Sequence, residues 1–249
     1  QRKKIKKAKI VSKKCMIFLD TDDIIMNQIK YINEINFSDL VQWQNELMFG
    51  RKKIDYFNDY HYKSCADNNV LSIYINKAKQ MKYIKDFSDS GMNLKVLSLG
   101  LFSAEYLARE LFNAKDQKSY MIWAVGDDVD EMIIMKEGLF KSIIKFQRIN
   151  KTIIPISYIG SEKYAKDCFN KIEKSFPKDL KSMDIVDKIY MYQKSPNTDM
   201  KKILKKNKEL ATILNPLLKV DFPKKHKIDQ IGSSYLSEMG YIFKTVNND

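Results

Sequence analysis

The stretch YMIWAVGDDVDEMIIMKEGLFKSIIKF, residues 120–146, decides the fold class. Its three apolar runs cover residues 120–125, 132–135 and 139–146. The middle run is too short for a helix, and the last one mixes apolar and polar residues near a period of two. The turn Gly126-Asp127-Asp128 separates the first two runs, and Glu137-Gly138, where glycine accepts the positive φ of a hairpin turn, separates the last two. The stretch therefore predicts a strand, a turn of phosphate-loop size, and two further antiparallel strands.

The composition is typical of a folded, basic protein. The 249 residues are 44% hydrophobic, which is enough for the core of one large domain or two small ones. Lysine and arginine outnumber the carboxylates by 44 to 31, which gives a net charge of +13. Because this excess is spread along the chain without a recognition motif, we expect solvated lysine-rich faces and no nucleic-acid partner. For the very basic residues 1–14, a linker and a contact with an anionic membrane surface both stay open.

Few residues suit a metal site or a membrane span. Three widely separated cysteines and two histidines offer no ligand spacing, so we predict no metal and a reducing compartment. No apolar run reaches the roughly 18 residues of a transmembrane helix, and no signal peptide is visible. The chain begins with Gln1. We interpret it as a fragment and leave open a membrane span beyond either end.

Apolar patterns predict alternating strands and helices along the whole chain. We expect strands at residues 16–19, 24–32, 54–62, 70–75, 94–99 and 153–159. We expect helices at residues 38–49, 77–88, 103–112, 163–173, 200–214 and 228–243. Ser38 is a good N-cap for the first helix, and Gly50 ends it. Residues 185–192 read as a short strand or helix, and the whole order predicts an α/β protein.

This ordered set resembles the PilM family of actin-like type IV pilus assembly proteins and, more distantly, the cytoplasmic domain of the GspL family of type II secretion proteins. The matching runs are IIMNQIKYI (24–32), SDLVQWQNELMFG (38–50), IDYFNDYHY (54–62), residues 70–112 and residues 120–146, with weaker matches at 157–172 and 228–243. The resemblance implies an actin-like (ribonuclease H-like) two-lobed α/β fold. Residues 1–118 would form the first lobe, including a small inserted α/β subdomain at about 36–113, and residues 119–249 the second.

The resemblance also implies a nucleotide site, but with departures. Its residues would be Gly126, Asp127 and Asp128 of the second phosphate loop and Gly160 and Ser161 of the adenosine turn. The family's first phosphate loop, an Asp-x-Gly after the first strand, has no match here. The acidic residue of the second loop falls at Ala124, which cannot handle magnesium and water, and the adenosine turn has a single glycine. We therefore expect a shortened nucleotide lobe, a vestigial site, no cofactor and no enzymatic activity, with residual ATP and magnesium binding as the alternative.

The function that the resemblance implies is that of a non-catalytic cytoplasmic scaffold in a type IV pilus or type II secretion inner-membrane platform. Such a scaffold links inner-membrane partners to the assembly ATPase through protein–protein contacts, by strand addition or helix docking. Aromatic residues that suit these contacts are Trp43, Tyr56, Tyr60 and Tyr62. For Trp43 we favour a second interpretation, a core position in its helix.

A magnesium-dependent phosphatase of the haloacid dehalogenase type is the alternative function. Asp20 and Asp22 follow an apolar strand with the spacing of a nucleophile and an acid/base. Ser98 ends a later strand, and Gly126-Asp127-Asp128 resembles the magnesium turn of these enzymes. However, the segment between Ser98 and Gly126 is short, and a hairpin is predicted after Asp130 where the phosphatases have a helix. We therefore prefer the actin-like scaffold.

Overall fold

A computed structural model describes residues 14–32, 34–50, 57–62, 65, 68–149, 152–175, 185–194, 200, 209–216 and 236. Contacts divide the chain into two compact units, which are described separately. Unit 1 comprises residues 1–63 and 70–99, and unit 2 comprises residues 64–69 and 100–249. No helix in the described ranges is long and apolar enough to cross a membrane.

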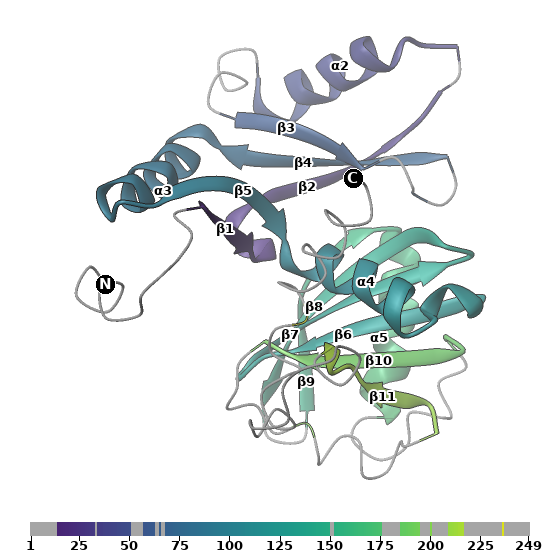
Figure 1. The fold of residues 1–249 in the computed structure, drawn as a ribbon. Coiled ribbons are helices and arrows are strands. Elements are labelled where there is room, and N and C mark those ends of the chain that lie inside the picture. The colour runs from purple at the N-terminus through teal and green to yellow at the C-terminus, as the bar shows by residue number, and fades with distance from the viewer. Residues whose placement is uncertain are drawn as a thin grey trace. The chain divides into compact units, whose positions relative to one another are not determined.

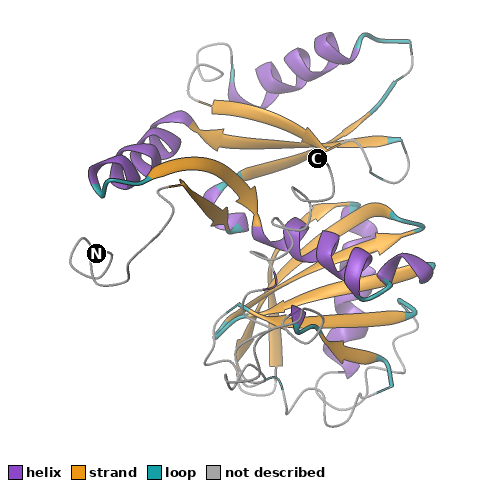
Figure 2. Ribbon diagram, viewed as in Figure 1, coloured by secondary structure: helices purple, strands orange, loops and turns teal. Residues whose placement is uncertain are grey.

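Unit 1 contains five strands and two longer helices within the described residues (Figures 1 and 2). They are β1 (Lys14–Leu19), β2 (Ile25–Lys30), α2 (Phe37–Phe49), β3 (Phe57–Tyr62), β4 (Asn69–Asn76), α3 (Lys77–Asp89) and β5 (Asn93–Leu99). Strands β1 and β5 pair in parallel, and a three-stranded sheet has the order β2-β4-β3, with β3 and β4 antiparallel.

Helix α2 packs on one side of the three-stranded sheet. Leu40 and Val41 bury against Ile29 of β2, and the buried amide of Asn45 accepts a hydrogen bond from the Tyr74 hydroxyl at 2.6 Å. The predicted N-cap is wrong by two residues, because Asn36 Oδ1 accepts from the backbone N–H of Ser38 at 2.9 Å and the helix begins at Phe37. The predicted end is confirmed, since Gly50 caps the helix with a φ of 65°.

Unit 2 is built around a six-stranded sheet of order β11-β10-β6-β7-β8-β9. Its described elements are α4 (Gly100–Leu111), β6 (Ser119–Val125), β7 (Val129–Lys136), β8 (Leu139–Ile149), β9 (Thr152–Gly160), α5 (Glu162–Ser175), β10 (Lys188–Gln193) and β11 (Ala211–Ile213). Strands β6 to β9 form an antiparallel meander, while β10 pairs in parallel with both β6 and β11.

Two helices cover opposite faces of this sheet (Figure 1). Alternate side chains of β6, such as Met121 and Trp123, pack with Phe169 of α5 in the main core. Tyr120, which points to the other face, donates a hydrogen bond to Glu105 of α4 at 2.6 Å. Because both faces are covered, every side chain from residue 120 to 125 is buried, and this explains the uninterrupted apolar run.

The hairpin prediction for residues 120–146 is confirmed. Glu137 and Gly138 connect β7 and β8 with φ values of 54° and 75°, so both turn residues adopt the left-handed region. The predicted helix at 200–214 is wrong at its end, because residues 211–213 form β11 on the edge of the sheet. The helix predicted at 228–243 lies outside the described residues, apart from residue 236.

Helix α4 packs within unit 2 through Glu105 and through Phe102, whose ring centroid lies 5.7 Å from that of Phe140. Helix α4 therefore packs against the meander on the face of the sheet opposite to α5. The lobe boundary expected at residues 118 and 119 stays a prediction.

Candidate functional site

The turn that joins β6 to β7 is the predicted second phosphate loop. It contains Gly126, Asp127 and Asp128, and the two aspartates are exposed. A Cβ atom at Gly126 would lie 2.1 Å from the backbone oxygen of Val129, so the chain returns on itself too closely for any side chain. Glycine is therefore needed here for the close approach of two backbone segments.

A buried carboxylate fills the inner side of this turn. Asp130 is fully buried at the start of β7, and its Oδ1 accepts a hydrogen bond from the backbone N–H of Gly126 at 3.0 Å. Its Oδ2 accepts a second hydrogen bond from the indole N–H of Trp123 at 2.8 Å. The turn is therefore held by a side chain of its own hairpin.

Arg148 near the end of β8 completes this arrangement. Its Nε lies 2.9 Å from Oδ2 of Asp130, and its Nη2 donates to the carbonyl oxygen of Gly126 at 2.5 Å. Its backbone N–H donates to the carbonyl of Asp128 at 2.8 Å. Burial raises the pKa of Asp130, while the Arg148 guanidinium acts in the opposite direction. We call Asp130 and Arg148, with the contacts to Gly126, the turn latch.

The latch decides what the turn can do chemically. A phosphate loop binds its ligand through backbone N–H groups that point out of the turn. The Gly126 N–H instead points to a carboxylate, and two more carboxylates, Asp127 and Asp128, stand at the outer side of the turn. A phosphate approaching this turn would meet negative charge, so the geometry fits a structural hairpin better than an anion site.

A second charged cluster lies on the other face of the same sheet end. Ala124, which the resemblance aligns with the acidic residue of the second phosphate loop, pairs across the sheet with Glu131, and Glu131 pairs with Lys145. Glu131 is buried, with Lys145 Nζ at 3.8 Å and Lys194 Nζ at 3.1 Å. The backbone N–H of Lys194 also donates to the carbonyl of Val125 at 2.9 Å. This cluster joins the ends of β6, β7, β8 and β10.

The predicted adenosine turn is not brought close to the latch. Gly160 ends β9 and pairs with Ser142, whose own partner on β7, Ile134, lies opposite Met121. That row is four residues before the end of β6, so Gly160 and Ser161 lie toward the opposite end of the sheet from Gly126 and two strands beyond β7. A Cβ at Gly160, whose φ is 93°, would lie 2.6 Å from the Lys141 carbonyl oxygen. Close packing therefore explains the glycine at position 160 without a nucleotide.

A turn follows the first strand, but it does not have the Asp-x-Gly sequence of a first phosphate loop. Asp20-Thr21-Asp22 follows β1 directly, and Asp22 stands where an Asp-x-Gly loop has its glycine. Asp23 forms an ion pair with Lys79 of α3. This turn therefore offers carboxylates and lacks the glycine that lets a backbone approach a phosphate.

The residues of the phosphatase alternative are spread over two sheets. Ser98 on β5 pairs with Phe18 on β1, so Ser98 lies on the strand next to the one that Asp20 follows. Gly126-Asp127-Asp128 ends a strand of the six-stranded sheet and is followed by a strand instead of a helix. Within the described ranges, no three histidine, cysteine or acidic side chains are placed to hold a metal ion.

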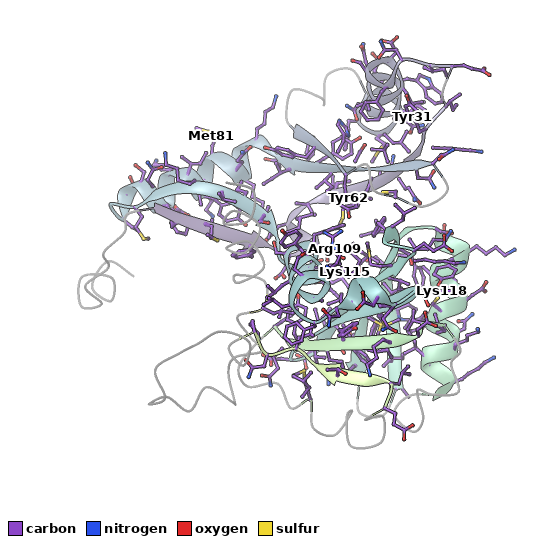
Figure 3. The ribbon with its side chains drawn as sticks, turned by 45° about the vertical axis from the view of Figure 1, so that its right-hand side comes forward. Tyr31, Tyr62, Met81, Arg109, Lys115 and Lys118 are labelled. Atoms are coloured by element: carbon purple, nitrogen blue, oxygen red, sulfur yellow. The ribbon has the colours of Figure 1, made fainter. Side chains whose placement is uncertain are left out.

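The aromatic residues predicted for partner binding differ in exposure. Trp43 on α2 is 56% exposed, so its interpretation as a core residue is wrong. Tyr60 on β3 is 53% exposed, and Tyr62, at the end of the same strand, is half-buried (Figure 3). Tyr56 lies outside the described residues.

Sequence reasoning missed the groups that hold the turn, namely Asp130, Arg148, Glu131 and Lys194. One signal was available for Asp130. With period-two alternation, residues 130, 132 and 134 share a face, and Met132 and Ile134 are core residues. A carboxylate on that face needs a buried partner, which Arg148 supplies.

Comparisons with solved structures show that the chain has an actin-like fold. The structure of a PilM-PilN type IV pilus biogenesis complex superimposes with a TM-score of 0.62 and 12% identity, over 98% of this chain and 84% of that one. A Bacteroides thetaiotaomicron protein with an actin-like ATPase fold and unknown function gives a TM-score of 0.46 and 10% identity, over 92% and 72% of the two chains. The cytoplasmic domain of EpsL, an inner-membrane component of the Vibrio cholerae type II secretion system, gives 0.42 and 7%, over 92% and 74%.

The sequence itself has no such match: no family model and no curated protein matches it. The superposition on the PilM-PilN complex thus confirms the resemblance to the PilM family at the level of the fold.

Proposed function

We propose that this protein is a non-catalytic scaffold of a type IV pilus or type II secretion inner-membrane platform. It would lie in the cytoplasm at the inner membrane, either as a peripheral protein or as the soluble part of an anchored one. There it would link membrane partners to the assembly ATPase. The likeness of its fold to the chain of a PilM-PilN complex supports this proposal.

The observation that carries the non-catalytic part is the turn latch. In an actin-like ATPase the second hairpin must present free backbone N–H groups to phosphate and an acid to magnesium and water. Here the Gly126 N–H binds Asp130 at 3.0 Å, and the position of the acid is Ala124. Glu131, which lies opposite Ala124 across the sheet, is ion-paired with Lys194. Neither position 124 nor the ion-paired Glu131 would then supply the acid that handles magnesium and water.

Titration of ATP with magnesium into the purified protein by calorimetry tests this proposal. We expect no heat of binding up to millimolar ATP and no release of phosphate. Micromolar binding with hydrolysis would contradict a non-catalytic role. A phosphate-ester screen with Asp20→Ala as control tests the phosphatase alternative: loss of turnover in that variant would establish it in place of the scaffold.

The scaffold role needs a test in the native host. A tagged copy expressed at its natural level is purified from detergent-solubilised membranes, and its partners are identified by mass spectrometry. We expect membrane platform proteins and the assembly ATPase of one pilus or secretion system. Their absence at natural expression levels, with a folded protein, would contradict the scaffold.

A further inference from the structure

The outer face of helix α2 exposes apolar side chains next to carboxylates. Trp43 and Leu47 are 56% and 63% exposed, although Leu40 and Val41 of the same helix are buried. Asp39, Trp43, Glu46 and Leu47 have the spacing i, i+4, i+7 and i+8, which places them on one side of an α-helix. We call these four residues the α2 stripe.

The charge of this region is opposite to that of the whole chain. Residues 31–50 contain Glu34, Asp39 and Glu46 and no lysine or arginine, which gives −3 in a chain of net charge +13. Lys30 and Arg51 flank the region on both sides. The α2 stripe is therefore an acidic, apolar strip on a basic protein, and its charge restricts what can cover it.

Three occupants can be compared on this basis. An anionic lipid surface is repelled by Asp39 and Glu46. A second copy packing α2 against α2 would bring the same carboxylates together, which is unfavourable. A helix with apolar residues on one side and lysine or arginine at its margins would bury Trp43 and Leu47 and pair with the carboxylates.

We propose that the α2 stripe docks a basic amphipathic helix of a partner protein. Trp43 is the central anchor because a large exposed aromatic side chain contributes most to such contacts. The carboxylates of Asp39 and Glu46 select the basic partner and increase its association rate. This inference rests on the proposed scaffold function for its biological role, but the docking chemistry can be tested alone.

The probe is a fluorescently labelled three-heptad peptide with a leucine stripe and lysines at its margins, and its binding is followed by anisotropy. A second peptide with glutamates in place of the lysines is the charge control. We expect the lysine peptide to bind at micromolar concentrations, and more weakly as salt is raised. The double variant Trp43→Ser with Leu47→Ser weakens binding by about tenfold or more. Asp39→Asn with Glu46→Gln weakens it severalfold and flattens its salt dependence.

Met81 provides the matched control for lost apolar surface. It lies on α3 (Figure 3) and is 62% exposed. We therefore expect Met81→Ser to remove exposed apolar surface elsewhere in unit 1 and to leave peptide binding unchanged. Circular dichroism confirms that each variant is folded. Equal binding of the two peptides, or undiminished binding to the serine double variant, would overturn the inference. So would a dimer in sedimentation, or binding to anionic phosphatidylglycerol vesicles, that disappears in the double variant.

Failure of this inference can be separated from failure of the scaffold. Co-purification of the platform proteins with the serine double variant, at the level of the wild type, would overturn the docking helix and leave the scaffold intact. Loss of the same proteins in that variant alone, with normal binding in Met81→Ser, supports both.

Discussion

The Oδ1 atom of Asp130 lies 3.0 Å from the backbone nitrogen of Gly126, inside the turn that connects the first two strands of the six-stranded sheet. The same carboxylate binds the Trp123 indole and lies beside the Arg148 guanidinium. One side chain thus ties the turn, the core and a third strand together. Because Asp130 is fully buried, each of these contacts is formed away from water, where an unpaired partner is costly.

Removing the latch carboxylate is expected to destabilise unit 2. In Asp130→Ala, Arg148 loses its buried counterion, and the Trp123 and Gly126 donors lose this acceptor, so we expect a loss of about 3 kcal/mol in the free energy of unfolding. Urea denaturation followed by circular dichroism measures it. Asp128→Asn, at an exposed position of the same turn, is the control and changes stability by less than about 0.5 kcal/mol. Similar losses in both variants would contradict the latch.

Gly126 and Gly138 are needed for different reasons: a close approach of the backbone at Gly126 and a positive φ at Gly138. Gly138 has a φ of 75° with open space around its missing side chain, so Gly138→Ala costs only the conformational penalty of about 1 kcal/mol. Gly126→Ala must displace the Val129 carbonyl, which a Cβ would approach to 2.1 Å, and we expect about 3 kcal/mol or more. Thermal unfolding of both variants provides the comparison, and a smaller effect at residue 126 would refute the steric argument.

The titration of Glu105 should make the stability of the protein depend on pH. Burial raises the pKa of Glu105, and its hydrogen bond from Tyr120 acts in the opposite direction. The folded protein therefore holds this proton more tightly than the unfolded chain, whose pKa is about 4.3. The stabilisation of the folded state by protonated Glu105 is fully present below the unfolded pKa. It is lost as pH rises through the higher pKa of the folded state.

Glu105→Gln tests this directly, because glutamine keeps an acceptor for Tyr120 but cannot titrate. We expect the stability of the variant to improve relative to the wild type as pH is raised from 4 to 7, measured by urea unfolding at each pH. Asp130 titrates in both proteins, so its contribution cancels in the difference. Parallel curves for the two proteins would show that Glu105 is ionised equally in the folded and unfolded states.

The cluster around Glu131 should respond unequally to the loss of its members. Lys194 is about one quarter exposed, so Lys194→Met removes a partly screened ion pair and costs about 1 kcal/mol. Glu131→Gln leaves the buried Lys145 ammonium without this counterion and costs about 3 kcal/mol. The double variant measures the coupling, which is zero if the residues act independently. An equal cost for the two single variants would contradict the predicted asymmetry.

The sequence predicts the strands well where burial produces a clear pattern of apolar residues. Residues 120–125 and 132–135 are continuous apolar runs because helices cover both faces of their sheet, and Glu137-Gly138 marks the hairpin between β7 and β8. The site depends on pairs far apart in the chain, such as Asp130 with Arg148 and Glu131 with Lys194. No local pattern reveals such pairs. The prediction that Trp43 is buried was wrong for a related reason. Apolar residues cover a wide part of the α2 surface, so the helical period does not show which of them are buried.

The contrast between Trp43 and Trp123 has a practical consequence. The chain contains two tryptophans, one in each compact unit, and one is more than half exposed while the other is fully buried. Their emission should therefore separate into a red-shifted, iodide-quenchable component from unit 1 and a blue-shifted, protected component from unit 2. Without any added label, the intrinsic spectrum distinguishes a protein that melts in one step from one whose two halves melt in succession.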